Sequence, residues 1–272
     1  MNTPRGIKPL VLLFLLVLPN LQGQKISVQN GNWGTANAKD ITCVLESTSQ
    51  IFLPYLLFLK KKKISVYPSS MPKIYYDRSH SGEYRINLSA KDRNWCQYAF
   101  QFAHELAHLI CRTKRGDSSN NWFEESLCEA VSLYALNELS NAWSDSPPFP
   151  TWHSYAVEFK KYRADRIINS DCPENFQISS WWKENKSLLC KNSNLRKQNL
   201  WVAIQILPII EEKPEVAWGA MEWLNHSKSH KTKSFRKYLY EWKMACPEKQ
   251  QKEFVLQVSQ VFGIFKLRNL DI

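Results

Sequence analysis

Residues 95–112 read WCQYAFQFAHELAHLICR, and this stretch decides the fold. Its apolar residues recur every three or four positions, which is the period of an α-helix that buries one face. Just before it, Ser89-Ala-Lys-Asp92 matches the capping-box pattern that often begins a helix. We therefore predict a helix here, and we expect the rest of the domain to pack around it.

The predicted helix carries His104 and His108 four residues apart, so the two imidazoles lie one turn apart on the same face. Two imidazoles in that arrangement can bind one Zn²⁺, and Glu105 beside them can act as general base to a metal-bound water. The pattern therefore predicts a zinc site with Glu105 as its catalytic residue, and no other cofactor is expected. Two alternatives stay open. The histidines are ordinary polar residues of a surface helix, or the site binds zinc without catalysis.

A catalytic zinc site needs a third protein ligand, which we expect from a second helix predicted over residues 122–139. Glu125 and Glu129 lie four apart and share one face of that helix. One of them is expected to bind the metal, and the other to accept a hydrogen bond from a ligand histidine. Glu124 points about 100° away from Glu125 on the helix, so we expect it to cap its own helix instead.

These motifs resemble those of the gluzincin metallopeptidases, which include thermolysin-like and aminopeptidase-like enzymes. The resemblance covers residues 64–140. Trp122-x-x-Glu125 is similar to the W-x-x-E-G stretch of the aminopeptidase-like members, with Ser126 in place of Gly. It implies that Glu125 is the third zinc ligand. The acid four residues later, Glu129, matches the carboxylate that orients a ligand histidine in the thermolysin-like members.

The chain departs from the gluzincin pattern in two ways. Sixteen residues separate His108 from Glu125, which is fewer than those families usually have. If this spacing decides, Glu129 is the third ligand instead. The family also places a Tyr or His downstream to stabilise the oxyanion, and nothing in the sequence selects one. The candidates for that role are His153 and Tyr155, together with Tyr162 and His226.

The fold class is predicted to be helix-rich α+β. Three β-like runs, over residues 64–67, 73–76 and 84–88, are separated by turn-forming residues and predict a small, mostly antiparallel sheet packed on the active-site helix. The resemblance implies that the last strand, residues 84–88, aligns the substrate backbone. A helix over residues 38–59 should break near Pro54. After residue 143 we expect mainly helices, predicted near residues 152–168, 196–211, 214–226, 232–244 and 248–262.

Residues 1–23 have the outline of a secretory signal peptide, with two cations before a short apolar run and a polar end. An uncleaved N-terminal anchor is the alternative. We divide the remaining chain into a metallopeptidase core with the zinc site, residues 24–143, and a helical C-terminal lobe of the same domain, residues 144–272. Seven cysteines in an exported chain predict disulfides, with Cys172 and Cys190 as the first pair, whereas Cys111 and Cys128 either form a second bond or are buried thiols.

The formal charge is +11, and it falls to about +9 when Arg5 and Lys8 leave with the signal peptide. Such a charge favours association with an anionic envelope. The basic residues are scattered, so we expect no nucleic-acid partner. The sequence predicts an exported zinc-dependent hydrolase, a peptidase whose partners are peptides or proteins, with the oligomeric state left open. The alternatives are a non-catalytic zinc-containing module and a metal-free basic protein that binds the envelope.

Overall fold

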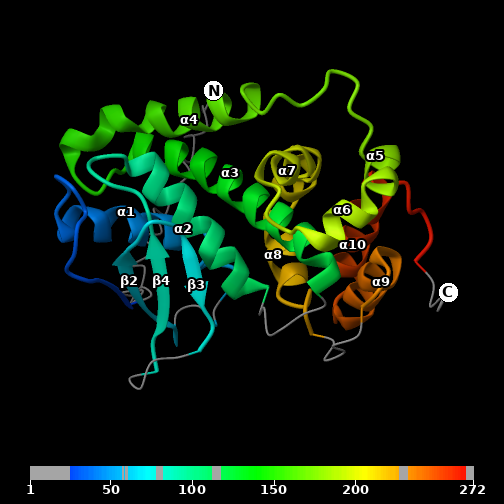
Figure 1. The fold of residues 1–272 in the computed structure, drawn as a ribbon. Helices are drawn as coiled ribbons and strands as arrows, with labels where there is room; N and C mark the ends of the chain where they lie inside the picture. Colours follow the sequence, from blue (N-terminus) through cyan, green and yellow to red (C-terminus); the bar gives the residue numbers. More distant parts are fainter. Residues whose placement is uncertain are drawn as a thin grey trace, which may run out of the picture.

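The computed structural model of the chain describes residues 25–56, 58, 61–77, 82–111, 118–226 and 232–267. The predicted signal peptide, residues 1–23, lies outside these ranges. Within them, no helix combines the length and the apolar character that crossing a bilayer requires. The described elements form a small sheet at one end and an array of helices that fills the rest of the molecule (Figure 1).

The sheet has four strands in the order β1-β2-β4-β3. Their bounds are Lys25–Val28 for β1, Lys63–Pro68 for β2, Lys73–Tyr75 for β3 and Tyr84–Leu88 for β4. β1 pairs with β2 and β2 with β4 in parallel, and only β3 pairs antiparallel with β4. The helix-rich α+β class is therefore confirmed, but the prediction of a mostly antiparallel sheet is wrong.

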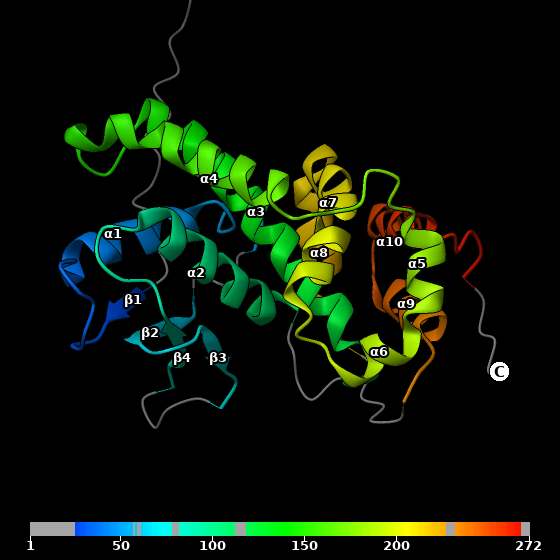
Figure 2. The ribbon, with the colours of Figure 1, turned by 45° about the horizontal axis from the view of Figure 1, so that its top comes forward.

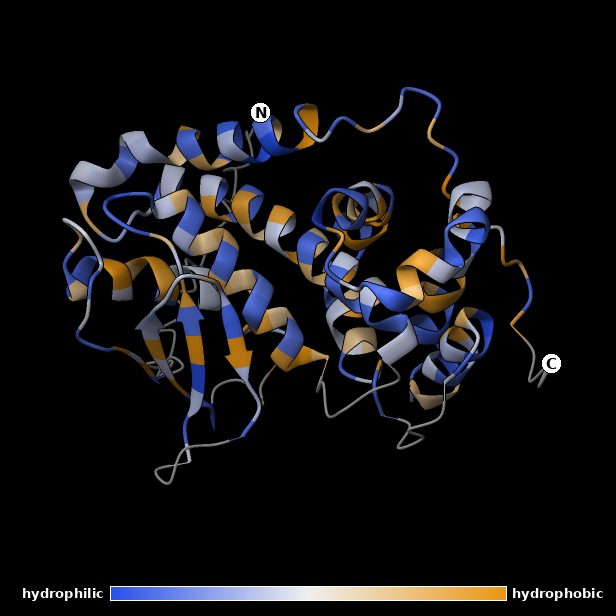
Figure 3. Ribbon diagram, in the orientation of Figure 1, coloured by the Kyte–Doolittle hydropathy of each residue, from blue (hydrophilic) through white to orange (hydrophobic). Residues whose placement is uncertain are grey.

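The strand directions follow from the connections. Helix α1, Ala38–Gln50, follows β1 along the chain and makes the crossover that a parallel partner such as β2 requires. β3 then reverses direction at the edge, and β4 returns between β2 and β3, so it runs parallel to β2. β4 alternates hydrophilic and hydrophobic residues (Figure 3), with Ile86 and Leu88 fully buried. The sequence reading missed β1, and with it the parallel half of the sheet.

Helix α2, Trp95–Ile110, is the predicted helix and is buried along almost its whole length. It packs against α1, α3, β3 and β4. The predicted capping box is wrong, because the helix begins only after Asn94, and Asn94 makes no side-chain cap. Asp92 instead accepts hydrogen bonds from the backbone and hydroxyl of Thr35, and the Ser89 N–H donates to Gln101. These contacts fix the loop that leads from β4 into α2.

Helix α3, Asn121–Asp145, is the centre of the molecule, and its buried residues lie on all its faces. It packs against α2 on one side and against α4, Ala156–Ile168, and α7, Arg196–Glu212, on others (Figure 2). Phe123 on α3 contacts Phe235, Tyr238, Trp242 and Phe262 from the C-terminal part of the chain. The division of the chain at residue 144 stays a prediction. These contacts join buried side chains from the two sides of that boundary.

The other elements are short or lie in the C-terminal half. They are η2 Ser118–Asn120, η3 Pro150–Tyr155, α5 Ile178–Glu184, α6 Lys186–Lys191, α8 Pro214–Met221, α9 Phe235–Ala245 and α10 Lys249–Val261. The mainly helical C-terminal half is as predicted. The two short helices α5 and α6 were not predicted, because seven and six residues are too few to show a helical period.

Candidate metal centre

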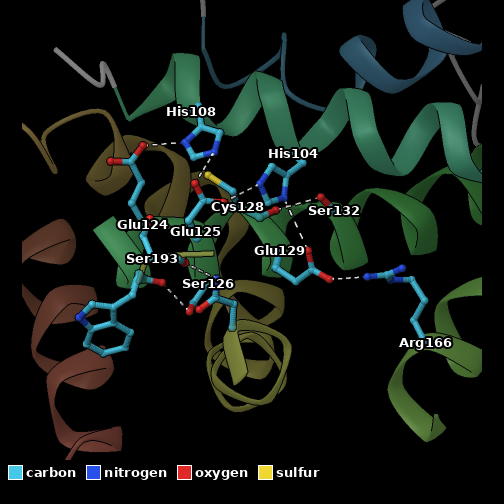
Figure 4. A network of polar contacts seen from close by, with 12 residues as sticks. His104, His108, Glu124, Glu125, Ser126, Cys128, Glu129, Ser132, Arg166 and Ser193 are labelled. Carbon is cyan, nitrogen blue, oxygen red and sulfur yellow. Dashed lines mark hydrogen bonds and ion pairs between the residues drawn. The ribbon is translucent and has the colours of Figure 1, made fainter. Parts of the chain in front are cut away.

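Two buried helices bring the predicted site residues together. His104 and His108 come from α2, and Glu125 and Glu129 come from α3 (Figure 4). Glu105 also belongs to α2. Glu105 is 5% exposed and His108 is 8% exposed. The alternative of ordinary polar residues on a surface helix is therefore wrong. Polar groups buried this deeply require partners, and each histidine finds them among the acids of α3.

The carboxylate of Glu125 contacts both histidines. Its Oε2 is 3.2 Å from His104 Nε2, and its Oε1 is 3.5 Å from His108 Nε2. The Glu125 carboxylate therefore bridges the two Nε2 atoms, with a different oxygen toward each. Two imidazole nitrogens and one carboxylate oxygen form a donor set that suits Zn²⁺, so the residues fit the metal that the motif implies.

The opposite nitrogens of the two imidazoles are held by two other carboxylates. Glu129 Oε2 is 3.6 Å from His104 Nδ1, and Glu124 Oε1 is 2.7 Å from His108 Nδ1. Such contacts select the tautomer that leaves Nε2 free to bind a metal, and they fix the plane of the ring. Glu129 thus lies where the sequence placed an orienting acid. The prediction that Glu124 caps its own helix is wrong, because this side chain contacts His108 instead.

Glu124 was missed because its partners are remote in the sequence. Its Oε2 accepts a hydrogen bond of 2.7 Å from Asn225 Nδ2, and Asn225 Oδ1 accepts one of 3.0 Å from the hydroxyl of Tyr238 on α9. One signal could have revealed it. Glu124 lies among the apolar residues Trp122, Phe123 and Leu127, so it belongs to the buried side of α3, where an unpaired carboxylate is not tolerated.

Glu129 is supported from α4. Its Oε1 accepts a hydrogen bond of 2.6 Å from the guanidinium of Arg166, which lies 3.9 Å from the centroid of the Phe100 ring. The aromatic ring and the carboxylate together hold Arg166 in place. Both orienting acids are thus anchored by residues that follow them in the chain, by 37 positions for Arg166 and by 101 for Asn225.

The acids dominate the electrostatics of the cluster. Burial lowers the pKa of His104, but hydrogen bonds to Glu125 and Glu129 outweigh it and raise the pKa to about 9. Burial likewise opposes the charge of His108, yet Glu124 and Glu125 raise its pKa well above the ordinary value. Burial tends to raise the pKa of Glu125, but the two histidines hold it below its usual range. A field that favours protons on imidazoles also favours a divalent cation between them.

Cys128 is a second candidate for the third ligand. Its thiol and one nitrogen from each of His104 and His108 lie within 4.8 Å of one another. Cys128 is fully buried, however, and burial together with a hydrogen bond to the Cys111 thiol raises its pKa well above that of a free cysteine. We favour Glu125, because its carboxylate faces both Nε2 atoms and lines the open cleft, whereas Cys128 does not line that cleft.

None of the seven cysteines, all of which lie among the described residues, forms a disulfide. The predicted Cys172–Cys190 disulfide is therefore not formed, and Cys111 and Cys128 are buried thiols, which is the second of the two readings left open for them. Cys190 lies exposed at the end of α6 and Cys172 is half-buried. The stretch that leads from Cys172 to Cys190 was expected to be a loop closed by this disulfide. It contains the short helices α5 and α6 instead.

A cleft of about 690 Å³ opens beside the histidines. It is lined by the edge strand β3, by α2 and α3, by α4 and by the start of α7. A backbone hydrogen bond from Ile74 on β3 reaches Glu105, whose pKa is raised by burial. The prediction that residues 84–88 form the substrate strand is wrong, because β4 has a neighbour on each side. β3 pairs with β4 on one side only, and its residues Lys73 and Ile74 line the cleft. The unpaired edge in the described sheet is therefore that of β3, not of β4.

The structure also separates the four oxyanion candidates. The Tyr155 hydroxyl accepts a hydrogen bond from the Cys96 backbone N–H at the start of α2, away from the cleft. Exposed His153 and His226 do not line the cleft either. Tyr162 on α4 does line it, with its ring 6.1 Å from that of Phe100. Of the four candidates, His153, Tyr155 and His226 are therefore not brought to the cleft, and Tyr162 is.

Comparisons of the chain with protein-family models, with curated proteins and with solved structures find no match.

Replacing Glu124 with Gln should weaken metal binding without abolishing it. The amide keeps the shape of the side chain but loses the charge that holds the Nδ1–H of His108, and loss of such an orienting contact typically costs about 10- to 100-fold in metal affinity. Competition with a chelator of known affinity measures the change. Glu138→Gln, on α3 but outside the cluster, is the matched control. Equal affinities for the two variants would contradict the orienting role of Glu124.

Proposed function

We propose that this chain is a zinc-dependent hydrolase that cleaves peptide bonds. The observation that supports this most directly is the Glu125 carboxylate facing the Nε2 atoms of both His104 and His108, beside Glu105 in an open cleft. His104, His108 and Glu125 would hold the metal, leaving a fourth position toward the cleft. When bound, Zn²⁺ polarises the scissile carbonyl and lowers the pKa of water.

The chain's own residues then carry the remaining steps. Glu105 accepts a proton at its carboxylate as water attacks the carbonyl carbon, and it gives that proton to the leaving amine nitrogen. Burial raises its pKa, which brings a carboxyl group closer to the range in which it can do both. The outer edge of β3, which pairs with no other strand of the described sheet, can align an extended peptide by the backbone groups that Glu105 does not use. The hydroxyl of Tyr162 is the candidate that can stabilise the oxyanion from α4.

Export belongs to the same proposal. Residues 1–23 would direct secretion or, if uncleaved, would anchor the chain at the membrane. The net positive charge would then bring the enzyme to anionic envelope polymers, where its peptide or protein substrates lie.

One observation favours a second function, a non-catalytic zinc module. The group of His104, His108 and buried Cys128 is the kind of donor set that closed structural zinc sites use. A site closed by the thiolate would need no cleft and no Glu105. The two functions predict different results in the experiment that follows.

Metal analysis of the purified full chain should find one zinc per polypeptide, and the zinc-loaded protein should cleave members of a peptide library. A chelator should abolish cleavage, and added Zn²⁺ should restore it. Zinc at one equivalent without cleavage of any peptide would favour the non-catalytic module. Absence of stoichiometric metal would overturn both zinc readings in favour of a metal-free basic protein.

A further inference from the structure

The side of the cleft formed by α4 and the start of α7 has no role in the chemistry above, apart from Tyr162. We call it the α4–α7 wall, and it consists of Tyr162, Arg166, Asn194, Arg196 and Asn199. The acids that line the cleft, Glu105, Glu125 and Glu129, all belong to α2 and α3. The α4–α7 wall carries only cationic and neutral polar or aromatic groups, so the two sides of the cleft differ in charge.

The two arginines of the wall differ in what they already bind. Arg166 forms an ion pair with Glu129 and stacks on Phe100, so Glu129 largely neutralises its charge. Arg196 is exposed to the cleft and has no acidic partner among the residues that the structure describes. It is also the first residue of α7, a helix of 17 residues without a side-chain cap. The N–H groups of that first turn add partial positive charge beside the guanidinium.

Asn199 supplies an independent sign that a ligand binds here. It is 5% exposed and lines the cleft one turn into α7. Its Nδ2 donates a hydrogen bond of 2.8 Å to the backbone oxygen of Ser193, which fixes the orientation of the amide. Its Oδ1 is buried and has no hydrogen-bond partner in the described structure. Buried acceptors without a donor are rare, and an N–H of a bound peptide is one donor that could satisfy this oxygen.

We propose that the α4–α7 wall is a subsite for a carboxylate carried by the peptide substrate. Arg196 and the start of α7 bind the carboxylate, and Asn199 Oδ1 accepts an N–H of the same peptide. A guanidinium binds a carboxylate through two parallel N–H bonds, which a neutral amide cannot reproduce. The carboxylate is either the C-terminus of the peptide or an Asp or Glu side chain. The proposal rests on the proposed peptidase function, because it names the substrates that the same cleft selects.

The test compares matched peptides on the zinc-loaded full chain. One pair differs only in a free or amidated C-terminus, and a second pair differs only in Glu or Gln near the scissile bond. We expect the charged member of one pair to have a kcat/KM at least about tenfold higher, as a charge-assisted hydrogen bond implies. The pair that shows the preference identifies the source of the carboxylate. Equal rates within both pairs would overturn the subsite.

Arg196→Gln should remove that preference, so that the charged and the neutral member of the pair are cleaved at the same rate. Lys197→Gln is the matched control, because it removes the same charge from the next residue, which is exposed, pairs with Asp171 and does not line the cleft. If the preference survives Arg196→Gln, or if Lys197→Gln removes it equally, the overall positive electrostatic potential of the protein is responsible for it. Either result would overturn the assignment to Arg196.

Direct binding separates this proposal from the proposed function. Fluorescence anisotropy of the labelled peptides measures affinity whether or not they are cleaved. If no peptide is cleaved but the charged peptide binds more tightly and Arg196→Gln alone abolishes the difference, the carboxylate subsite stands and the peptidase function falls. If peptides are cleaved, but the charged and neutral peptides have equal affinities and equal cleavage rates, the peptidase function stands and the subsite falls.

Discussion

Replacing Glu105 with Gln should lower peptide cleavage by about 10²–10⁴-fold, the usual contribution of a positioned general base. The amide has the size of the carboxyl group but cannot take a proton from water. The side chain is buried between α2 and β3, and an isosteric replacement avoids leaving a cavity there. Zinc content and thermal unfolding should therefore stay close to those of the parent, so the lost activity reports on chemistry alone.

The control for this experiment is Glu46→Gln, the same change at an exposed position of α1 far from the cluster in the chain. It should cleave peptides like the parent. A Glu105→Gln protein that keeps its zinc and cleaves at the parental rate would refute Glu105 as the general base. Loss of zinc from that variant would instead assign Glu105 a part in holding the metal, which also contradicts the mechanism.

Replacing Glu125 with Ala should reduce zinc affinity by more than about 100-fold, beyond the range expected when only an orienting carboxylate is lost. Cys128→Ala should retain one zinc per chain, because the thiol does not line the cleft. Glu129→Ala should fall between the two. This ranking follows from the distances, since Glu125 lies beside both Nε2 atoms, whereas Glu129 contacts the other nitrogen of His104.

Cobalt substitution provides a spectroscopic measurement that can be made first on the parent protein, without any variant. A thiolate ligand would give Co²⁺ an intense sulfur-to-metal charge-transfer band in the near ultraviolet, and two imidazoles with a carboxylate would not. We expect the parent to lack this band. Its presence in the parent and its disappearance in Cys128→Ala would assign the third position to Cys128. The same result would favour the structural zinc module over the hydrolase.

The local part of the site could be predicted from the sequence because it depends on helical period alone. Residues four apart share a face, so His104 with His108 and Glu125 with Glu129 were expected to meet across two helices. The structure brings these four side chains together. The position of Glu124 was not foreseen, because its direction depends on how α3 is rotated against α2. That rotation is set by packing around Phe123 and Trp122, not by the sequence of α3 alone.

The non-local part could not be predicted. β1 is only four residues long, and without it nothing indicated a parallel sheet or the position of β3 at the edge. The supports of the orienting acids, Arg166 and Asn225, become neighbours only after the chain has folded. The capping motif before α2 failed for a related reason. The Asp92 carboxylate accepts hydrogen bonds from Thr35, in the loop after β1, and does not cap the helix.

The hydrogen bonds from Tyr238 through Asn225 to Glu124 bear on when the site is completed. Both histidines leave the ribosome more than a hundred residues before Tyr238 does. A nascent or truncated chain that ends before α9 would carry the whole zinc motif and Asn225, but it would lack the Tyr238 hydroxyl that holds Asn225 in place beside Glu124. The order of synthesis thus makes the last support of the site available only late, and for the proposed hydrolase this would delay a fully assembled site until synthesis is nearly complete.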